Sequence, residues 1–230
     1  MSRQAGKQSG FSASPSISAP PWIGAPCLEL VREFNERLIE AVYETARESD
    51  RRRAPEMVRT HRDLWVNLDP AARRRAGRFP FLLADIQFRN AAWWRRARNE
   101  ASWQGCPPGS THLFLRRRAV ELTRDALIVA WITAQQDTRL AVTLLAMSKE
   151  VAGIVATLGL DHLRRIPDLH YWHLRPRWDH SDLFWGRLLS AASRGDRQAL
   201  RGLHMHALQL ADSDSGSAAS AAGANTVVHD

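Results

Sequence analysis

The sequence predicts an all-α protein, and three observations support that prediction. Apolar residues recur at helical spacing through most of the chain, as Val31, Phe34 and Leu38 do within residues 28–49. Ser, Asp or Asn residues stand just before many of these runs, where their side-chain oxygens can accept the free N–H groups of a first helical turn. The regular succession of such caps and apolar stripes leaves little room for strands.

The expected helices follow one another with short connections. Their ranges are 28–49, 55–65, 70–75, 79–88, 90–98, 111–132, 138–146, 149–158, 162–166, 182–192 and 197–210. Predicted caps stand before seven of them, at Asp69, Asn90, Asp137, Ser148, Asp161, Ser181 and Asp196. Residues 79–88, FPFLLADIQF, also fit a short strand, but their length and helical neighbours favour a helix.

Composition divides the chain into four parts. Residues 1–26 are rich in Ser, Pro, Gly and Ala, and residues 212–230 in Ser, Ala and Gly, so both are expected to be disordered. The loop-like run at 102–109, SWQGCPPG, separates an N-terminal helical module (27–109) from a second helical module (110–211).

The charge balance points to anionic partners. The formal net charge is +8 and the pI about 10.8, and Lys7 and Lys149 are the only lysines. Arginine suits bidentate contacts to phosphate and guanine. A GC-rich genome also replaces lysine with arginine without any functional reason, so arginine content alone leaves both explanations open.

Other functional classes find little support. Cys27 and Cys106 belong to no CxxC or Cys/His cluster, which fits a reducing cytoplasm and argues against a zinc module. No apolar run is long enough for a membrane helix. The chain contains no nucleophile elbow, P-loop, dinucleotide fingerprint or HExxH, so an enzyme is not expected, and no cofactor is predicted.

A tryptophan pair and a histidine pair can each be interpreted as a functional site or as ordinary packing. Trp93 and Trp94, beside arginines, could stack on bases, but packing inward is favoured. His170 and His173, with Asp168, could hold a metal, but histidines beside aromatic residues more often pack or lie at the surface. No metal site is therefore predicted.

The longest nearly continuous apolar stretch, 126–178, contains a candidate helix-turn-helix. Ser148 caps the first helix, Gly159 is expected to end it, and Asp161 caps a second helix that Pro167 stops. A helix pair with a glycine turn is also common in any all-α core.

This stretch resembles the FlhD family of flagellar transcriptional activator subunits. The resemblance rests on an ungapped pattern that combines a Gln-Asp pair with apolar helical positions and a basic-apolar run. The matching residues are Gln136, Asp137, Ala141, Leu145, Glu150, Val151, Ala152, Val155, Ala156, Leu158, Leu160, Leu163, Arg165 and Ile166. The resemblance implies a dimeric helical protein that acts with a partner subunit, similar to FlhC, at promoters.

The leading functional prediction is accordingly a DNA-associated transcriptional regulator subunit, with flagellar or motility genes as candidate targets. Its candidate DNA contacts are His162, Arg164, Arg165, Arg175 and Arg177. Its candidate self-association residues are Leu140, Leu144, Val151 and Val155, which recur at helical spacing. The alternative is a protein-interaction adaptor that does not bind DNA and presents a basic face to an acidic partner.

Overall fold

Helices make up most of the described chain, as predicted. The computed structural model describes residues 25–48, 54–100 and 113–209. The elements are α1 (Ala25–Glu48), α2 (Glu56–Thr60), α3 (Arg62–Val66), α4 (Pro70–Gly77), β1 (Ala84–Asp85), α5 (Ala91–Asn99), α6 (Arg116–Gln136), α7 (Thr138–Leu145), α8 (Lys149–Ala156), α9 (Leu160–His170), the 3₁₀ turn η1 (Tyr171–His173), β2 (Arg175–Pro176) and α10 (Asp182–Arg194). Residues 197–209 form a further helical segment.

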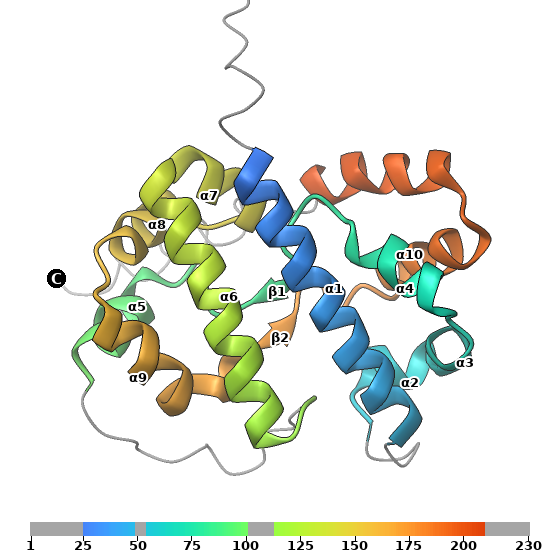
Figure 1. Ribbon diagram of the computed structural model, residues 1–230, viewed down its shortest axis with the longest axis horizontal. Coiled ribbons are helices and arrows are strands. Elements are labelled where there is room, and N and C mark those ends of the chain that lie inside the picture. The colour runs from blue at the N-terminus through green and yellow to red at the C-terminus, as the bar shows by residue number, and fades with distance from the viewer. Residues whose placement is uncertain (1–24, 49–53, 101–112, 210–230) are drawn as a thin grey trace, which may run out of the picture.

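The two longest helices, α1 and α6, lie side by side across the middle of the molecule (Figure 1). The predicted stripe of α1 is buried, with Val31, Phe34 and Leu38 fully inside. α4 and α3 pack on α1 and carry α10, while α7, α8 and α9 pack on α6. Because α1 joins both groups, elements of the two predicted modules, 27–109 and 110–211, share one hydrophobic core.

Local signals placed most helix starts correctly. The side chains of Asp69, Asn90, Asp137, Ser148 and Ser181 accept backbone N–H groups of the helices that follow them. Asp196 does the same for residues 197–209, through Gln198 and Ala199.

Two other helix boundaries differ from the prediction. The helix expected at 55–65 is divided at His61 into α2 and α3. The long central helix begins at Arg116; its predicted start at Thr111 lies outside the described residues, but Leu113, Phe114 and Leu115 precede the helix.

The prediction of a helix at residues 79–88 is wrong. The segment is irregular apart from β1, which pairs antiparallel with β2 in the register Ala84 to Pro176. Asn35, fully buried on α1, supplies the missing partners: its amide donates to the carbonyls of Phe79 (3.1 Å) and Phe81 (2.8 Å) and accepts from the Leu83 N–H (2.8 Å).

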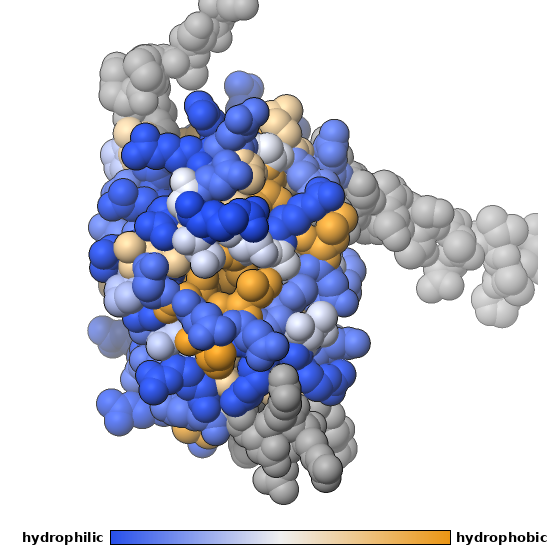
Figure 2. Space-filling model, turned by 90° about the vertical axis from the view of Figure 1, so that its right-hand side faces the viewer, coloured by the Kyte–Doolittle hydropathy of each residue, from blue (hydrophilic) through white to orange (hydrophobic). Residues whose placement is uncertain are grey.

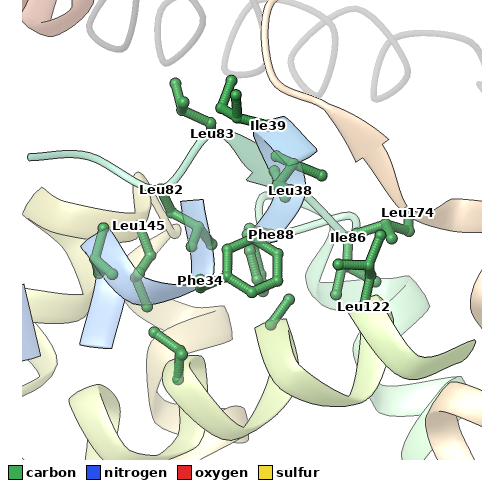
Figure 3. Close-up of a cluster of buried hydrophobic side chains, with 14 of the residues drawn as sticks. Phe34, Leu38, Ile39, Leu82, Leu83, Ile86, Phe88, Leu122, Leu145 and Leu174 are labelled. Atoms are coloured by element: carbon green, nitrogen blue, oxygen red, sulfur yellow. The ribbon is translucent and has the colours of Figure 1, made fainter. Parts of the chain in front are cut away.

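The same segment fills the centre of the core with apolar side chains. Leu82, Leu83, Ile86 and Phe88 gather against Phe34 of α1 and neighbouring core residues (Figure 3). Tertiary hydrogen bonds from a buried asparagine thus replace the local ones a helix would have used, which an apolar run by itself does not reveal.

The candidate helix-turn-helix also differs from expectation. Gly159 is the N-cap of α9 and has an extended backbone, and the Nδ1 of His162 accepts from the Gly159 N–H (3.1 Å), so Asp161 is not the cap. α9 continues through Pro167 to His170, because Ile166, Pro167 and Leu169 are buried and α9 packs along α6. Among the described residues, no helix is both long and apolar enough to cross a membrane.

Candidate functional site

The candidate DNA contacts lie on two elements. His162, Arg164 and Arg165 are on α9, whereas Arg175 and Arg177 are in and just after β2. Arg164 is exposed to solvent. Arg165 is half-buried, and its Nη2 donates to the Arg98 carbonyl at 2.8 Å. That carbonyl belongs to the last turn of α5, where backbone acceptors lack helical partners and a positive charge is favoured.

Arg175 and Arg177 do not form the pair of phosphate contacts that their spacing suggested. Arg175 is exposed, and its Nε and Nη2 both contact Oδ2 of Asp85 at 3.2 Å, across the β1–β2 ladder. Arg177 is only 8% exposed, and its guanidinium donates to the Leu145 carbonyl. Its backbone N–H also donates to the Leu83 carbonyl, and its own carbonyl accepts from the indole of Trp185. Arg177 is therefore a structural residue, and its assignment as a DNA contact is wrong.

A basic surface lies where α5 and α9 adjoin. We call it the α5–α9 face and define it by the exposed residues Arg96, Arg98, Leu160, Asp161 and Arg164. The Arg165–Arg98 hydrogen bond fixes the two helices to each other. The α5–α9 face is not purely basic, because the first turn of α9 also exposes the carboxylate of Asp161 and the side chain of Leu160, which is 66% exposed.

A cluster of histidine and tryptophan side chains lies beside this face, under the C-terminal end of α9. The Trp93 indole donates to Nε2 of His173 at 3.1 Å, which makes that nitrogen an acceptor and keeps the ring neutral. Nε2 of His170 lies 3.2 Å from Oε2 of Glu100, and both side chains are largely buried. The rings of His170 and His173 are 6.1 Å apart between centroids, with Trp172 beside both.

The surroundings of this cluster disfavour charged imidazoles. Burial, with smaller contributions from His170, Arg96 and Arg175, lowers the pKa of His173 to about 4. Burial also lowers the pKa of His170, although the Glu100 carboxylate opposes that shift. At neutral pH both rings are therefore expected to be uncharged and to serve as packing groups.

The cluster is not arranged as a metal centre. Asp168 is exposed and forms an ion pair with Arg124 (3.3 Å). Within the part of the chain that the structure describes, no three His, Cys, Asp or Glu side chains are grouped as metal ligands. Trp93 and Trp94 are buried, so the favoured inward packing is confirmed and neither is a base-stacking platform.

Half of the candidate self-association residues are inaccessible. Val151 and Val155 are fully buried in the core, so their assignment to a dimer contact is wrong. Leu140 and Leu144 are half-buried on α7, and the Leu144 carbonyl accepts from the Leu82 N–H at 2.8 Å. Because all four recur at helical spacing, the sequence did not show which of them face the core.

Comparison with known proteins finds no matching family model, curated protein or solved structure for this chain. The resemblance to the FlhD family therefore stays a prediction, and the functional argument rests on the surfaces described above.

Proposed function

We propose that this protein is an interaction adaptor whose α5–α9 face binds another protein. The observation that supports this proposal is the first turn of α9, which exposes Leu160 and Asp161 one helical turn before Arg164. A recognition helix presents its N-terminal residues to DNA bases and phosphates. A large apolar side chain and a carboxylate at that position suit a protein partner better, since protein interfaces combine apolar anchors with arginine.

The partner of this face would carry acidic groups around an apolar contact. Arg96, Arg98 and Arg164 supply positive charge from two helices, and Leu160 supplies the apolar surface. Arginine stacks well and loses little freedom per hydrogen bond, so it can contribute strongly to a protein interface.

A photo-cross-linking amino acid at position 160, introduced in the cells that make the protein, tests this proposal. The adaptor function predicts a discrete covalent adduct with another polypeptide. Position 139 provides the control, because Arg139 is exposed on α7, away from the α5–α9 face in sequence and fold. Adducts with nucleic acid alone, or the same pattern from both positions, would contradict the proposal.

A DNA-associated regulator, acting with a partner subunit at promoters, is the second candidate. Three exposed arginines on adjoining helices, in a chain of net charge +8, favour it. Phosphate contacts release counterions, so each such contact adds about 0.9 to the slope of log affinity against log salt concentration.

Fluorescence titration of a labelled duplex at several salt concentrations separates the two functions. If the protein binds DNA through the α5–α9 face, the double variant Arg98→Ala, Arg164→Ala should flatten the slope by up to about two contacts. The matched variant Arg59→Ala, Arg139→Ala removes the same charge from exposed positions on α2 and α7. Equal slopes for both variants, with and without a partner subunit, would exclude these arginines as DNA contacts.

A further inference from the structure

A groove of about 690 Å³ lies on another side of the molecule, between α10 and the helical residues 197–209. One stripe of α10 forms a wall, with Leu183, Arg187, Ser190 and Arg194 at intervals of three or four residues. The opposite wall presents Ala199, Gly202 and Leu203. Figure 2 views the side of the molecule that carries these helices and shows apolar surface near its centre, with polar residues around it.

The groove combines exposed apolar side chains with an open, shallow floor. Leu183, which lines the groove, is 54% exposed. A Cβ added at Gly202 would meet no atom within 4 Å, so nothing in the described chain covers that point. Small residues such as Ser190, Ala199 and Gly202 allow another backbone to approach closely.

The first wall of the groove is held rigidly. Trp185 of α10 is fully buried against Trp65 of α3, with ring centroids 5.8 Å apart. The guanidinium of Arg75 on α4 donates to the Ala192 carbonyl at 2.7 Å and so closes the end of α10. A preformed wall loses little conformational entropy when a ligand binds.

The α10 wall of the groove is as long as a short helix. α10 has 13 residues, which corresponds to about 20 Å of helix. Two neighbouring helices with a furrow between them accept a third amphipathic helix, which inserts side chains at every third or fourth position.

The charges along the groove identify the kind of helix. Arg187 and Arg194 are exposed, lie two turns apart on the lining stripe, and form no ion pair within the described residues. Among the described residues that line the groove, Asp182 at the start of α10 is the only acidic one. A second copy of this chain would bring the same arginines against these, which opposes self-association here.

We propose that this groove binds an amphipathic helix of a partner protein, with an apolar face against Leu183 and Ala199 and with Asp or Glu residues opposite Arg187 and Arg194. This surface is separate from the α5–α9 face, so the protein can contact two partners, or two parts of one partner. The inference does not depend on the function of the α5–α9 face.

The probe is a fluorescein-labelled, stapled helical peptide of about 14 residues, roughly 20 Å long. Leucines occupy one face, and two glutamates seven residues apart flank it, to match the spacing of Arg187 and Arg194. A second peptide carries lysine in place of both glutamates. We expect the full-length protein to bind the glutamate peptide at least about tenfold more tightly than the lysine peptide.

Two glycines provide a matched pair of variants. Gly202 and Gly153 both lie in helices, both are exposed, and an added Cβ meets nothing within 4 Å at either position. Gly202→Gln places a neutral side chain on the wall of the groove, whereas Gly153→Gln places one on the exposed surface of α8. We expect Gly202→Gln to weaken binding of the glutamate peptide at least about tenfold and Gly153→Gln to leave it unchanged.

Three other results would contradict parts of the proposal. Equal binding of the glutamate peptide to both glutamine variants would overturn the groove as the site. Equal binding of the two peptides to the wild type would overturn its charge preference. A dimer seen by sedimentation equilibrium that Gly202→Gln dissolves and Gly153→Gln does not would show that a second copy occupies the groove, and would overturn the proposed partner. The DNA and cross-linking results above concern the α5–α9 face and can fail independently.

Discussion

Arginine plays different roles in two regions of this molecule. Around α9 and β2, Arg165 donates to the Arg98 carbonyl, Arg175 contacts Asp85, and Arg177 donates to the Leu145 carbonyl. On α10, Arg187 and Arg194 extend into solvent along an apolar groove and pair with no described residue. In the α9–β2 region, guanidinium groups connect elements of the same chain. On α10, the guanidinium groups of Arg187 and Arg194 are accessible to a partner.

The comparison shows why arginine content alone could not locate a binding surface. The guanidinium groups of Arg165 and Arg177 donate to backbone carbonyls that the ends of α5 and α7 leave open. A guanidinium group can bind a partner only where no backbone carbonyl or carboxylate of its own chain lies close to it. Whether such an acceptor is nearby depends on the fold. Four predictions test this difference between the two regions.

Replacement of Arg177 should damage the protein most. Arg177→Ala removes a buried donor and leaves the Leu145 carbonyl without it, so we expect the free energy of unfolding to fall by about 2–3 kcal/mol. Arg187→Ala should change it by less than about 0.5 kcal/mol, as for most exposed side chains. Urea denaturation followed by circular dichroism measures both, and similar losses for the two variants would contradict the assigned roles.

Lowering the pH should destabilise the protein through the histidine cluster of the α9–β2 region. The pKa of His173 falls from 6.5 to about 4 in the folded protein. Between these values the unfolded chain binds a proton at His173 that the folded chain does not, so the contribution of His173 lowers stability as pH falls from about 6.5 to 4 and is constant above that window. Arg96 and Arg175 add to this shift and Asp85 opposes it, while the lowered pKa of His170 acts in the same direction.

Melting temperatures measured across that pH window provide the test. His173→Gln keeps an acceptor for the Trp93 indole but cannot titrate, so its curve should be flatter than that of the wild type. His180→Gln serves as the control, because His180 is exposed and lies outside the cluster. A wild-type slope that His173→Gln leaves intact would assign the pH dependence to other groups.

Adjacent arginines on α9 should differ by a smaller amount. Arg165→Ala removes a charged donor from the C-terminal end of α5, and we expect a loss of about 1 kcal/mol. Arg164→Ala should be nearly neutral in stability, because Arg164 is exposed and alanine favours helix. Chemical denaturation of the two single variants makes the comparison, and equal effects would mean that the Arg165 hydrogen bond contributes little.

Sequence patterns predicted the parts of this fold that local interactions determine. Caps such as Asp69, Asn90 and Ser148 were found because an Ncap side chain bonds to the helix that immediately follows it. Residues 79–88 were assigned wrongly because their backbone partners come from Asn35 on α1 and from β2. The end of α9 was placed too early because packing on α6 carries the helix past Pro167.

The surfaces were harder to predict than the elements. Leu183 belongs to the apolar run of α10, yet it is largely exposed because Phe184, Trp185 and Leu188 occupy the inward face. Arg175 and Arg177 looked equivalent in sequence, but the path of the chain around Pro176 buries only one of them. The exposure of a single residue depends on which helix or strand packs against it, and the spacing of apolar residues in the sequence does not specify that neighbour.

Replacement of either of the two open glycines, Gly202 or Gly153, should raise the stability of the protein slightly. Glycine in a helix costs about 0.5–1 kcal/mol relative to alanine because its unfolded state is more flexible. Gly202→Ala and Gly153→Ala should therefore each stabilise the protein by about that amount, since a methyl group meets nothing at either position. If Gly202 keeps the groove wall low for a partner helix, Gly202→Ala should also weaken the glutamate peptide modestly, whereas Gly153→Ala should only stabilise. Thermal melts and peptide titration of the same samples measure both quantities, and a stabilised Gly202→Ala protein with unchanged peptide affinity would show that close backbone approach at this position is not required.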